Sequence, residues 1–344
     1  MKINYFYFKA LLYGLLHKYE ASHYKKALRF YPYRIGIELT NKCNLDCIHC
    51  IEKTGYEKGM MGFDKFKKVF NEFPYALSVS LNGVGEPLLH PQFFDIIRYI
   101  KHTRSYVITT IFSNGVLINE SMARDIIKSG LSKIHISLDA TNSSSHKKIR
   151  GTDKFDKVLN NIKTLVELKR KLHSKTPLIG INFILMKENE GELIEFIKLA
   201  KELGVDYICE IDSYLFNFGD WKLKGAKPLS FHKKELEEGK QELKKSGIKC
   251  MYYPELSKTY DWNKPFICDR FWKEIRVTFN GNVTPGCCIP FAEQYSYGNI
   301  LESSFKQIWN SEKFIKDREL AREGTAPILI CKECIEMTKK YLTL

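Results

Sequence analysis

Short apolar runs alternate with longer amphipathic segments over the first two thirds of the chain. Six runs are rich in β-branched and aromatic residues and are bounded by polar residues or glycine, as buried strands are. They are residues 33–39, 77–81, 106–112, 133–138, 179–185 and 206–211. Helical spacing of apolar residues lies between them, in residues 63–70, 93–101, 120–129, 154–172 and 190–203. This alternation predicts a parallel α/β sheet or barrel, whose crossovers bring the carboxyl ends of the strands to one rim.

The pattern changes after about residue 212. Residues 213–225 show neither period and predict a loop, whereas residues 231–246 are rich in Lys and Glu and predict a helix with a solvated face. Residues 274–279 and Val283 flank an Asn-Gly pair, which predicts a β-hairpin. The predicted divisions are an N-terminal helical segment (1–32), a barrel (33–228), a connecting helical segment (229–264) and a small cysteine-bearing domain (265–344).

The N-terminal residues 1–19 are aromatic and aliphatic, with interruptions at Lys2, Lys9, His17 and Lys18. They predict an amphipathic helix docked on the body of the protein, with a membrane-surface helix as the alternative. They lack the features of a secretory signal, and no apolar stretch of about 18 residues occurs anywhere, so no transmembrane segment is expected. We therefore predict a cytoplasmic protein, in which clustered cysteines indicate metal binding rather than disulfides.

Composition narrows the class of protein. The chain has 344 residues, of which 44% are hydrophobic and 13% aromatic, which excludes a disordered tail, a collagen-like fibre and a disulfide-dense mini-protein. Lys and Arg outnumber Asp and Glu by 54 to 40, a formal net charge of +14. This excess is spread along the helices without a dense block, so we expect solvated surface and acidic partners rather than nucleic acid.

Three cysteines follow the first predicted strand within eight residues: Cys43, Cys47 and Cys50, in the spacing C-x3-C-x2-C. Three thiolates can hold three irons of a 4Fe–4S cluster, which normally takes four cysteines, so one iron is left for a small molecule. The alternative is a zinc knuckle with His49 as the fourth ligand. Its position between Cys47 and Cys50 is poor geometry for a closed tetrahedral site.

Four short motifs follow in order, three of them directly after predicted strands. They are Val84-Gly85-Glu86-Pro87, Ser113-Asn114-Gly115, Ser137-Leu138-Asp139 and Arg150-Gly151. Together with the cysteine triad, they make residues 33–212 resemble the radical S-adenosylmethionine (radical SAM) superfamily. The chain departs from the family's glycine–glycine–glutamate motif at Val84, which replaces the first glycine, but Glu86 is retained.

This resemblance implies a partial (βα)6 TIM-like barrel that binds S-adenosylmethionine (SAM) at a 4Fe–4S cluster. Glu86 would accept hydrogen bonds from the ammonium group of SAM, and Arg150 would receive its carboxylate. The cofactor-binding residues that the resemblance implies are His49 near the adenine, Gly85, Glu86, Ser113, Asn114, Ser137, Asp139 and Arg150, with Ser113, Ser137 and Asp139 as partners for the ribose hydroxyls.

A second set of cysteines lies late in the chain: Cys268, Cys287, Cys288, Cys331 and Cys334. This segment resembles the SPASM extension of radical SAM enzymes, which holds auxiliary Fe–S clusters. Five cysteines fit one auxiliary cluster, most simply 4Fe–4S, with Cys268, Cys287, Cys331 and Cys334 as ligands. The choice between Cys287 and Cys288 stays open, and a structural zinc ribbon is the alternative.

The resemblance also implies a reaction. Reductive cleavage of SAM would give a 5′-deoxyadenosyl radical that abstracts a hydrogen atom, leading to oxidation, epimerisation or cross-linking of a peptide or a small molecule. A one-electron donor such as flavodoxin or ferredoxin would supply the electron. Glu210 and Asp212 share one face of the sixth predicted strand and are candidate acid/base groups.

Two questions remain open in the sequence. The predicted barrel begins near residue 33, which leaves little room for a peptide-recognition domain of usual size before it and favours a small substrate or recognition through a partner. The alternative to an enzyme is a non-catalytic zinc- or Fe–S-binding interaction protein. That alternative does not explain why Glu86, Ser113 and Asp139 all follow predicted strands.

Overall fold

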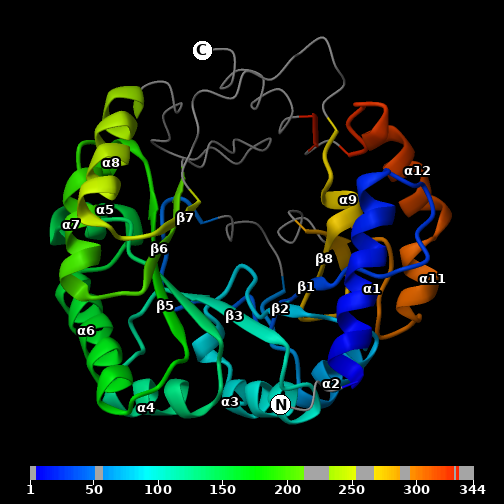
Figure 1. Cartoon of the computed structure of the whole chain (residues 1–344), viewed down its shortest axis with the longest axis horizontal. Helices are drawn as coiled ribbons and strands as arrows, with labels where there is room; N and C mark the ends of the chain where they lie inside the picture. The colour runs from blue at the N-terminus through cyan, green and yellow to red at the C-terminus, as the bar shows by residue number, and fades with distance from the viewer. Residues whose placement is uncertain are drawn as a thin grey trace. The chain divides into compact units, whose positions relative to one another are not determined.

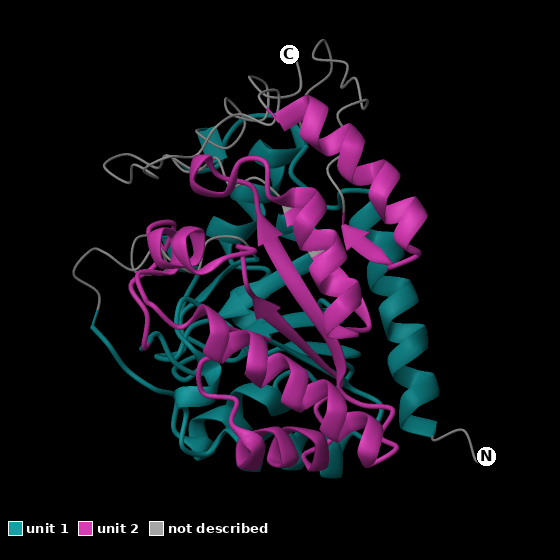
Figure 2. Ribbon diagram, turned by 90° about the vertical axis from the view of Figure 1, so that its left-hand side faces the viewer, with its two compact units in different colours: residues 1–43, 52–111, 262–335 teal, residues 44–51, 112–261, 336–344 magenta. Residues whose placement is uncertain are grey.

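A computed structural model of the chain describes residues 5–50, 57–212, 232–252, 267–286, 295–328 and 331–332. The chain divides into two compact units, drawn in teal and magenta in Figure 2. Unit 1 comprises residues 1–43, 52–111 and 262–335, and unit 2 comprises residues 44–51, 112–261 and 336–344. The predicted boundaries at residues 33, 229 and 265 remain predictions.

The sheet of unit 1 joins strands from both ends of the chain. Its strands are β1 (Arg34–Ile37), β2 (Ser78–Ser80), the first part of β3 (Ile108–Ser113), β8 (Glu274–Val277) and β9 (Val283–Pro285), in the order β3-β2-β1-β8-β9. All neighbours are parallel except β8 and β9, which form the predicted hairpin. The C-terminal cysteine-bearing segment therefore continues the sheet directly from β1, with Gly36 opposite Arg276.

The helices of unit 1 bury apolar residues at helical spacing. In α2 (Phe63–Asn71) the buried residues are Phe66, Val69 and Phe70, which lie on one face of the helix. The other described helices of this unit are α1 (Tyr5–Ser22), the short η1 (Pro87–Leu89), α3 (Phe93–Thr103), α9 (Arg270–Lys273), α11 (Phe305–Trp309) and α12 (Glu312–Arg322), labelled or coloured in Figure 1.

Unit 2 contains a parallel sheet in the order β4 (Lys133–Ser137), β5 (Leu178–Ile184), β6 (Tyr207–Asp212) and β7 (Cys250–Tyr252). Five consecutive residues of β5 are buried, which is why it reads as a continuous apolar run. Its helices are α4 (Glu120–Lys128), α5 (Ser143–Arg150), α6 (Phe155–Lys171), η2 (Lys187–Asn189), α7 (Leu193–Leu203) and α8 (Lys233–Ser246).

Each strand and helix predicted within the first two thirds of the chain is confirmed, as is the Lys/Glu-rich helix, α8. The sequence did not predict α5, whose residues are mostly polar, the 11-residue helix α12, or the short elements η1, η2, β7, α9 and α11. Residues 213–225, the predicted loop, lie outside the described residues. None of the described helices combines the length and the hydropathy that crossing a membrane requires.

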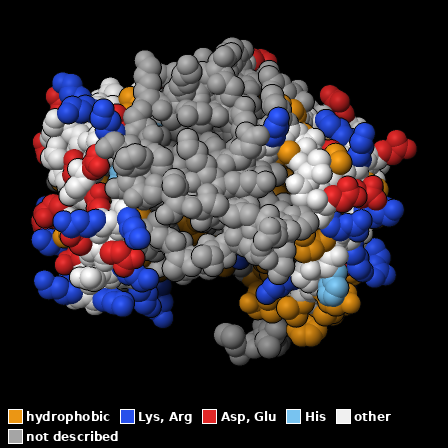
Figure 3. All heavy atoms as spheres, turned by 90° about the horizontal axis from the view of Figure 1, so that it is seen from above, with side chains coloured by type: hydrophobic (Ala, Val, Ile, Leu, Met, Phe, Trp, Pro, Cys, Tyr) orange, Lys and Arg blue, Asp and Glu red, His pale blue; other side chains and the backbone are white. Residues whose placement is uncertain are grey.

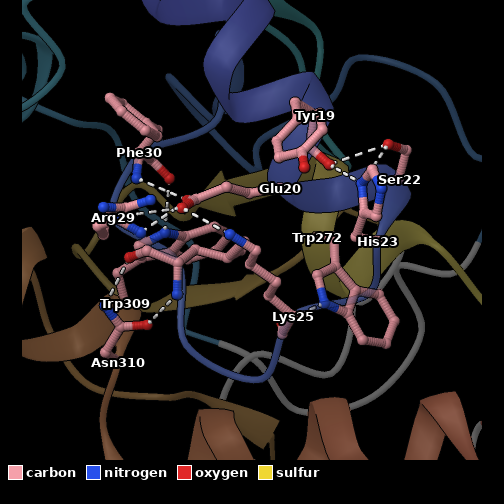
Figure 4. Close-up of polar contacts among 11 residues, drawn as sticks. Tyr19, Glu20, Ser22, His23, Lys25, Arg29, Phe30, Trp272, Trp309 and Asn310 are labelled. Atoms are coloured by element: carbon pink, nitrogen blue, oxygen red, sulfur yellow. Dashed lines mark hydrogen bonds and ion pairs between the residues drawn. The ribbon is translucent and has the colours of Figure 1, made fainter.

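The expected N-terminal helix is present as α1, and its inner face is docked on unit 1. Nε2 of His17 donates to the carbonyl oxygen of Trp272 over 2.8 Å. The buried Glu20 carboxylate accepts hydrogen bonds from the backbone N–H groups of Arg29 and Phe30, at 2.8 and 3.3 Å (Figure 4). The expectation of a polar outer face is wrong, because Phe8, Leu12, Leu15 and Tyr19 are exposed there.

Candidate functional site

The loop that carries Cys47 and Cys50 is held against the end of α5 in unit 2. The N–H of Ile48 donates to the carbonyl of Ile149 over 3.0 Å, and the N–H of Cys50 donates to the carbonyl of Cys47 over 3.1 Å. Cys47 is buried, and Cys50 is half-buried. These backbone bonds place the cysteine loop directly beside Arg150, the last residue of α5.

A buried ion pair lies next to Cys47. The guanidinium of Arg150 donates to the carboxylate of Asp139, and its Nη1 lies 3.6 Å from Sγ of Cys47. The other carboxylate oxygen of Asp139 accepts from the N–H of Ile184 over 2.9 Å. Burial alone would lower the pKa of Arg150, but the nearby Asp139 and Cys47 outweigh it and raise that pKa. Arg150 is therefore a fixed cation beside Cys47, a predicted cluster ligand.

His49 faces the same ion pair, with Nε2 3.9 Å from Oδ2 of Asp139. Burial, helped by the nearby Arg150, lowers the pKa of His49 to about 3, so the imidazole is neutral. Within the described residues, Nδ1 of His49 and Nε of Arg150 are buried without a hydrogen-bond partner. Buried polar atoms normally have a partner, so these two are suited to contact a bound polar molecule.

The Ser113-Asn114-Gly115 turn is fixed by its own side chains. The Ser113 hydroxyl accepts from the N–H of Gly115 over 3.1 Å, and the Asn114 amide donates to Oδ1 of Asn44 over 2.7 Å. Asn44 lies on the cysteine loop, so the turn and the loop are joined. Ser137, at the end of β4, pairs in register with Asn182 of β5.

Asn182 is a polar residue of this region that the sequence analysis did not select. Its Oδ1 is buried and has no partner within the described part of the chain. The signal was available, because Asn182 is the one amide within the apolar run 179–185. Asn189 was also missed: its amide donates to the backbone carbonyl of Asp139 over 2.9 Å and so helps to position that residue.

Unit 1 joins the Cys43 loop to the Gly85-Glu86 motif. The N–H of Glu86 donates to the carbonyl of Lys42 over 2.9 Å. A Cβ at Gly85 would lie 2.5 Å from the carbonyl oxygens of Thr40 and Lys42, so only glycine permits this approach. Oε1 of the buried Glu86 accepts from the N–H of Leu88 over 3.1 Å, where it caps η1.

The Glu86 loop is also tied to the C-terminal hairpin through Glu38. The Glu38 carboxylate accepts hydrogen bonds from the N–H of Val84 over 3.0 Å and from the N–H of Phe279 over 3.3 Å. Burial raises the pKa of Glu38 even though both hydrogen bonds oppose the shift. No sequence pattern indicates this contact, because Glu38 and Phe279 are 241 residues apart.

Arg276 makes a second tie between the same parts of unit 1. Its Nε donates to the carbonyl of Gly286 over 3.0 Å, and its Nη1 donates to the carbonyl of Asn82 over 3.2 Å. Gly286 directly precedes Cys287, and Asn82 directly precedes the Gly-Val-Gly-Glu stretch. The side chain crosses β1 at Gly36, where a Cβ would collide with it.

The donor set fits an Fe–S cluster with bound SAM. The triad supplies three thiols. Near Cys47 lie a cation, a neutral imidazole and two buried polar atoms that have no partner in the described part of the chain. Within the described ranges, no three His, Cys, Asp or Glu side chains are grouped closely enough to hold a single metal ion. A cubane places each thiolate on a different iron, so its ligands need not converge on one point.

Comparison with known families decides the identity. Residues 37–208, half of the chain, match the radical SAM superfamily, and residues 268–335 match SPASM, an iron–sulfur cluster-binding domain. The chain belongs to the radical SAM superfamily. It is a radical SAM enzyme with a SPASM domain, and SAM and Fe–S clusters are its cofactors. The predicted fold class is confirmed, and the alternative of a non-catalytic interaction protein is set aside.

Among curated relatives, this radical SAM enzyme is 26% identical over 322 residues to the tungsten-containing aldehyde ferredoxin oxidoreductase cofactor-modifying protein of Pyrococcus furiosus. That match covers 87% of this chain and 86% of the relative. A probable GTP 3′,8-cyclase of Saccharolobus solfataricus is 31% identical over 208 residues, 59% of this chain and 63% of the relative. The chain thus spans less than two thirds of the cyclase.

Among solved structures, Streptococcus suis SuiB bound to precursor peptide SuiA superimposes with a TM-score of 0.68 at 18% identity. The superposition covers 87% of this chain and 69% of SuiB. At this identity, the likeness confirms the radical SAM type of α/β fold.

The radical SAM enzyme carries a further polar network in unit 2, which the sequence did not predict. The hydroxyl of Tyr207 lies 2.6 Å from Nε2 of His135, and Nδ1 of His135 lies 3.3 Å from Sγ of Cys209. His135, Gly180 and Tyr207 are register partners on β4, β5 and β6. A Cβ at Gly180 would lie 2.7 Å from the Tyr207 ring, so the two side chains meet across a strand without one. Burial lowers the pKa of His135 to about 4.

Several predicted site residues are only partly described. The backbones of Glu210 and Asp212 belong to β6, but their side chains lie outside the described residues. Cys287, Cys288 and Cys334 also lie outside them. Cys268 is half-buried just before α9, and Cys331 is buried. The assignment of the auxiliary-cluster ligands therefore stays a prediction.

Proposed function

We propose that this radical SAM enzyme abstracts a hydrogen atom from a peptide or a small cofactor-like molecule, and that its residues hold SAM as the motifs imply. The observation that carries the proposal is the buried Arg150, which lies between Asp139 and Cys47. A charged group is costly to bury without partners. Among the described residues Nε of Arg150 has no partner, so this donor is available to a ligand.

In this proposal Cys43, Cys47 and Cys50 bind the first cluster, which with SAM supplies the 5′-deoxyadenosyl radical when both are bound. Arg150 holds the carboxylate of SAM, and Glu86 accepts from its ammonium group. Asp139 orients Arg150 and, with Ser113 and Ser137, offers acceptors to the ribose hydroxyls. His49, neutral because it is buried, lies against the adenine. Gly85 and Asn114 fix the loops that carry these groups.

The auxiliary cluster is proposed to bind Cys268, Cys287, Cys331 and Cys334. Support comes from the hairpin β8–β9, which Arg276 ties to the loop before Cys287. The same residue reaches Asn82, so the two ligand-bearing regions of unit 1 share one positioning side chain.

For the substrate, we propose a peptide or a cofactor precursor that is oxidised, epimerised or cross-linked. The relative that matches over most of both chains is named as a cofactor-modifying protein, which favours a maturation reaction. Glu210 and Asp212 are proposed to act as acid/base groups toward it. An acidic flavodoxin or ferredoxin would complement the net charge of +14 and is the proposed reductant.

The test measures 5′-deoxyadenosine released by anoxic, iron-reconstituted enzyme under dithionite. Arg150→Lys keeps the charge but loses the fork that reaches both Asp139 and a carboxylate, so we expect at least about a tenfold loss of product. Arg150→Ala should lose more. Arg104→Lys is the matched control, because Arg104 is also buried but donates to the backbone carbonyls of Phe70 and Phe73.

Both Arg150 variants are compared at equal iron content, and SAM binding is measured separately by equilibrium dialysis. Weakened SAM binding together with reduced cleavage supports the assignment. If Arg150→Ala cleaved SAM as fast as the wild type, Arg150 would not contribute to the SAM site and the proposal would be rejected.

A further inference from the structure

The outer face of α1 is apolar, although its inner face already packs on unit 1. The buried residues Ala10, Gly14, His17 and Ala21 follow the spacing i, i+4, i+7, i+11. Phe8, Leu12, Leu15 and Tyr19 follow the same spacing on the opposite side and are 60%, 49%, 65% and 58% exposed. We call these four residues the outer stripe of α1.

A surface helix of a globular protein normally turns polar residues to the solvent, and a helix that is apolar on both faces is normally covered on both. The outer stripe is widened by Tyr5, Leu11 and Leu16, which are also exposed and lie within about 70° of its centre around the helix. Figure 3 shows this gathering of hydrophobic side chains at the lower edge of the view. A contiguous exposed patch of this kind marks an interaction surface.

The charges around the stripe define what can cover it. At about 100° per residue, Lys9 and Lys18 fall roughly 90° to either side of the stripe, one at each border. Both lysines are exposed. The sole acidic residue of α1, Glu20, is on the inner face, where its carboxylate is bound by Arg29 and Phe30. The exposed charges of this helix are therefore all positive.

We propose that α1 lies in the plane of an anionic membrane surface and anchors the enzyme there as a peripheral protein. The stripe would enter the boundary between headgroups and acyl chains, where tyrosine and phenylalanine are favoured. Lys9 and Lys18 would extend from its two borders to lipid phosphates. The inner face stays bound to unit 1 through His17 and Glu20, so α1 offers one face to the lipid.

Charge favours a membrane over a second copy of the chain as the occupant. Two copies would bring together two chains that each have a formal net charge of +14, with the same lysines bordering both stripes. An anionic lipid surface attracts both the local lysines and the overall excess.

The test is flotation of full-length, anoxic holoenzyme with vesicles of phosphatidylcholine containing about one third phosphatidylglycerol. We expect the wild type to bind these vesicles at least about tenfold more strongly than pure phosphatidylcholine, and less strongly as salt is raised. The double variant Leu12→Gln/Leu15→Gln should lose at least about tenfold in binding. Lys9→Gln/Lys18→Gln should lose most of the preference for phosphatidylglycerol.

Met251→Gln is the matched control, because Met251 is 60% exposed on β7, away from α1 in the sequence and in the other unit. It should bind as the wild type does. Circular dichroism and 5′-deoxyadenosine formation confirm that each variant is folded. The proposal is overturned if the wild type does not float, or if the leucine variant floats equally well. A wild-type dimer that the leucine variant converts to a monomer, without vesicle binding, would overturn it in favour of a second copy.

Discussion

At the scale of single residues, Arg276 links two regions that lie far apart in the sequence. Its guanidinium binds the carbonyl of Gly286, next to a predicted cluster ligand, and the carbonyl of Asn82, next to the glutamate motif. It can do so because its β1 partner is Gly36. A guanidinium has several donors in a fixed plane, which suits it to hold two backbone carbonyls at once.

We therefore predict that Gly36→Ala, which puts a methyl group in the path of Arg276, disturbs both regions. The KM for SAM should rise by about three- to tenfold, and the electron paramagnetic resonance spectrum of the auxiliary cluster should change. Gly62→Ala is the control, because a Cβ there meets nothing within 4 Å. A rise in KM without a spectral change would show that Arg276 serves the SAM loop alone.

The residue scale also shows where prediction from sequence stops. Glu86, Asp139 and Arg150 were selected because each stands in a short motif. Glu38 and Arg276 were not, since the first contacts a residue 241 positions away and the second a residue 194 positions away. A motif records neighbours along the chain, whereas such contacts are set only when strands pair.

At the scale of elements, hydrophobic periodicity located the strands and longer helices of the first two thirds of the chain, because burial of one face or both leaves a regular pattern. It missed the later helix α12. It did not identify α5, which has few apolar residues and is defined by its ends: Asn142 caps the first turn, and Gly151 adopts a left-handed conformation after the last. Periodicity also did not predict that β8 pairs with β1, because the apolar pattern of a strand carries no information about which strand it pairs with.

The docking of α1 predicts how stability depends on pH. Burial lowers the pKa of His17 to about 4 in the folded protein, against an ordinary value of about 6.5. Below about pH 6.5, His17 is protonated in the unfolded chain but stays neutral in the folded protein until the pH approaches 4. The free energy of unfolding therefore falls as the pH decreases from about 6.5 to 4. The contribution of His17 over that window is at most about 3 kcal/mol.

His17→Gln removes this titration while keeping a donor for the carbonyl of Trp272. Urea unfolding at a series of pH values should show the wild type losing its advantage over the variant as the solution is acidified from pH 7. An advantage that stays constant down to pH 4.5 would contradict a neutral, buried His17.

At the scale of the whole molecule, the enzyme is expected to carry two clusters with separate ligand sets. The radical SAM match ends at residue 208 and the SPASM match begins at residue 268, so no cysteine belongs to both. Two 4Fe–4S clusters would give about eight irons per chain.

Replacing Cys43, Cys47 and Cys50 together with Ala should therefore leave about four irons and abolish release of 5′-deoxyadenosine. Iron analysis and chromatography of the reaction products check the two halves of this prediction. The complementary double variant, Cys268→Ala/Cys331→Ala, should lose the auxiliary cluster and keep the cluster of the triad. Cleavage that persists in the triple variant would reject the assignment of the first cluster.

Because Gly180 has no side chain, positions 135, 180 and 207 of unit 2 are expected to change together in evolution. His135 and Tyr207 touch only because nothing projects from the strand between them. A larger residue at position 180 would separate His135 from Tyr207 and leave two buried polar groups without their hydrogen bond. We therefore expect such a change to be tolerated only when positions 135 and 207 become smaller and apolar as well. Homologues should inherit this trio intact or replace it as a set.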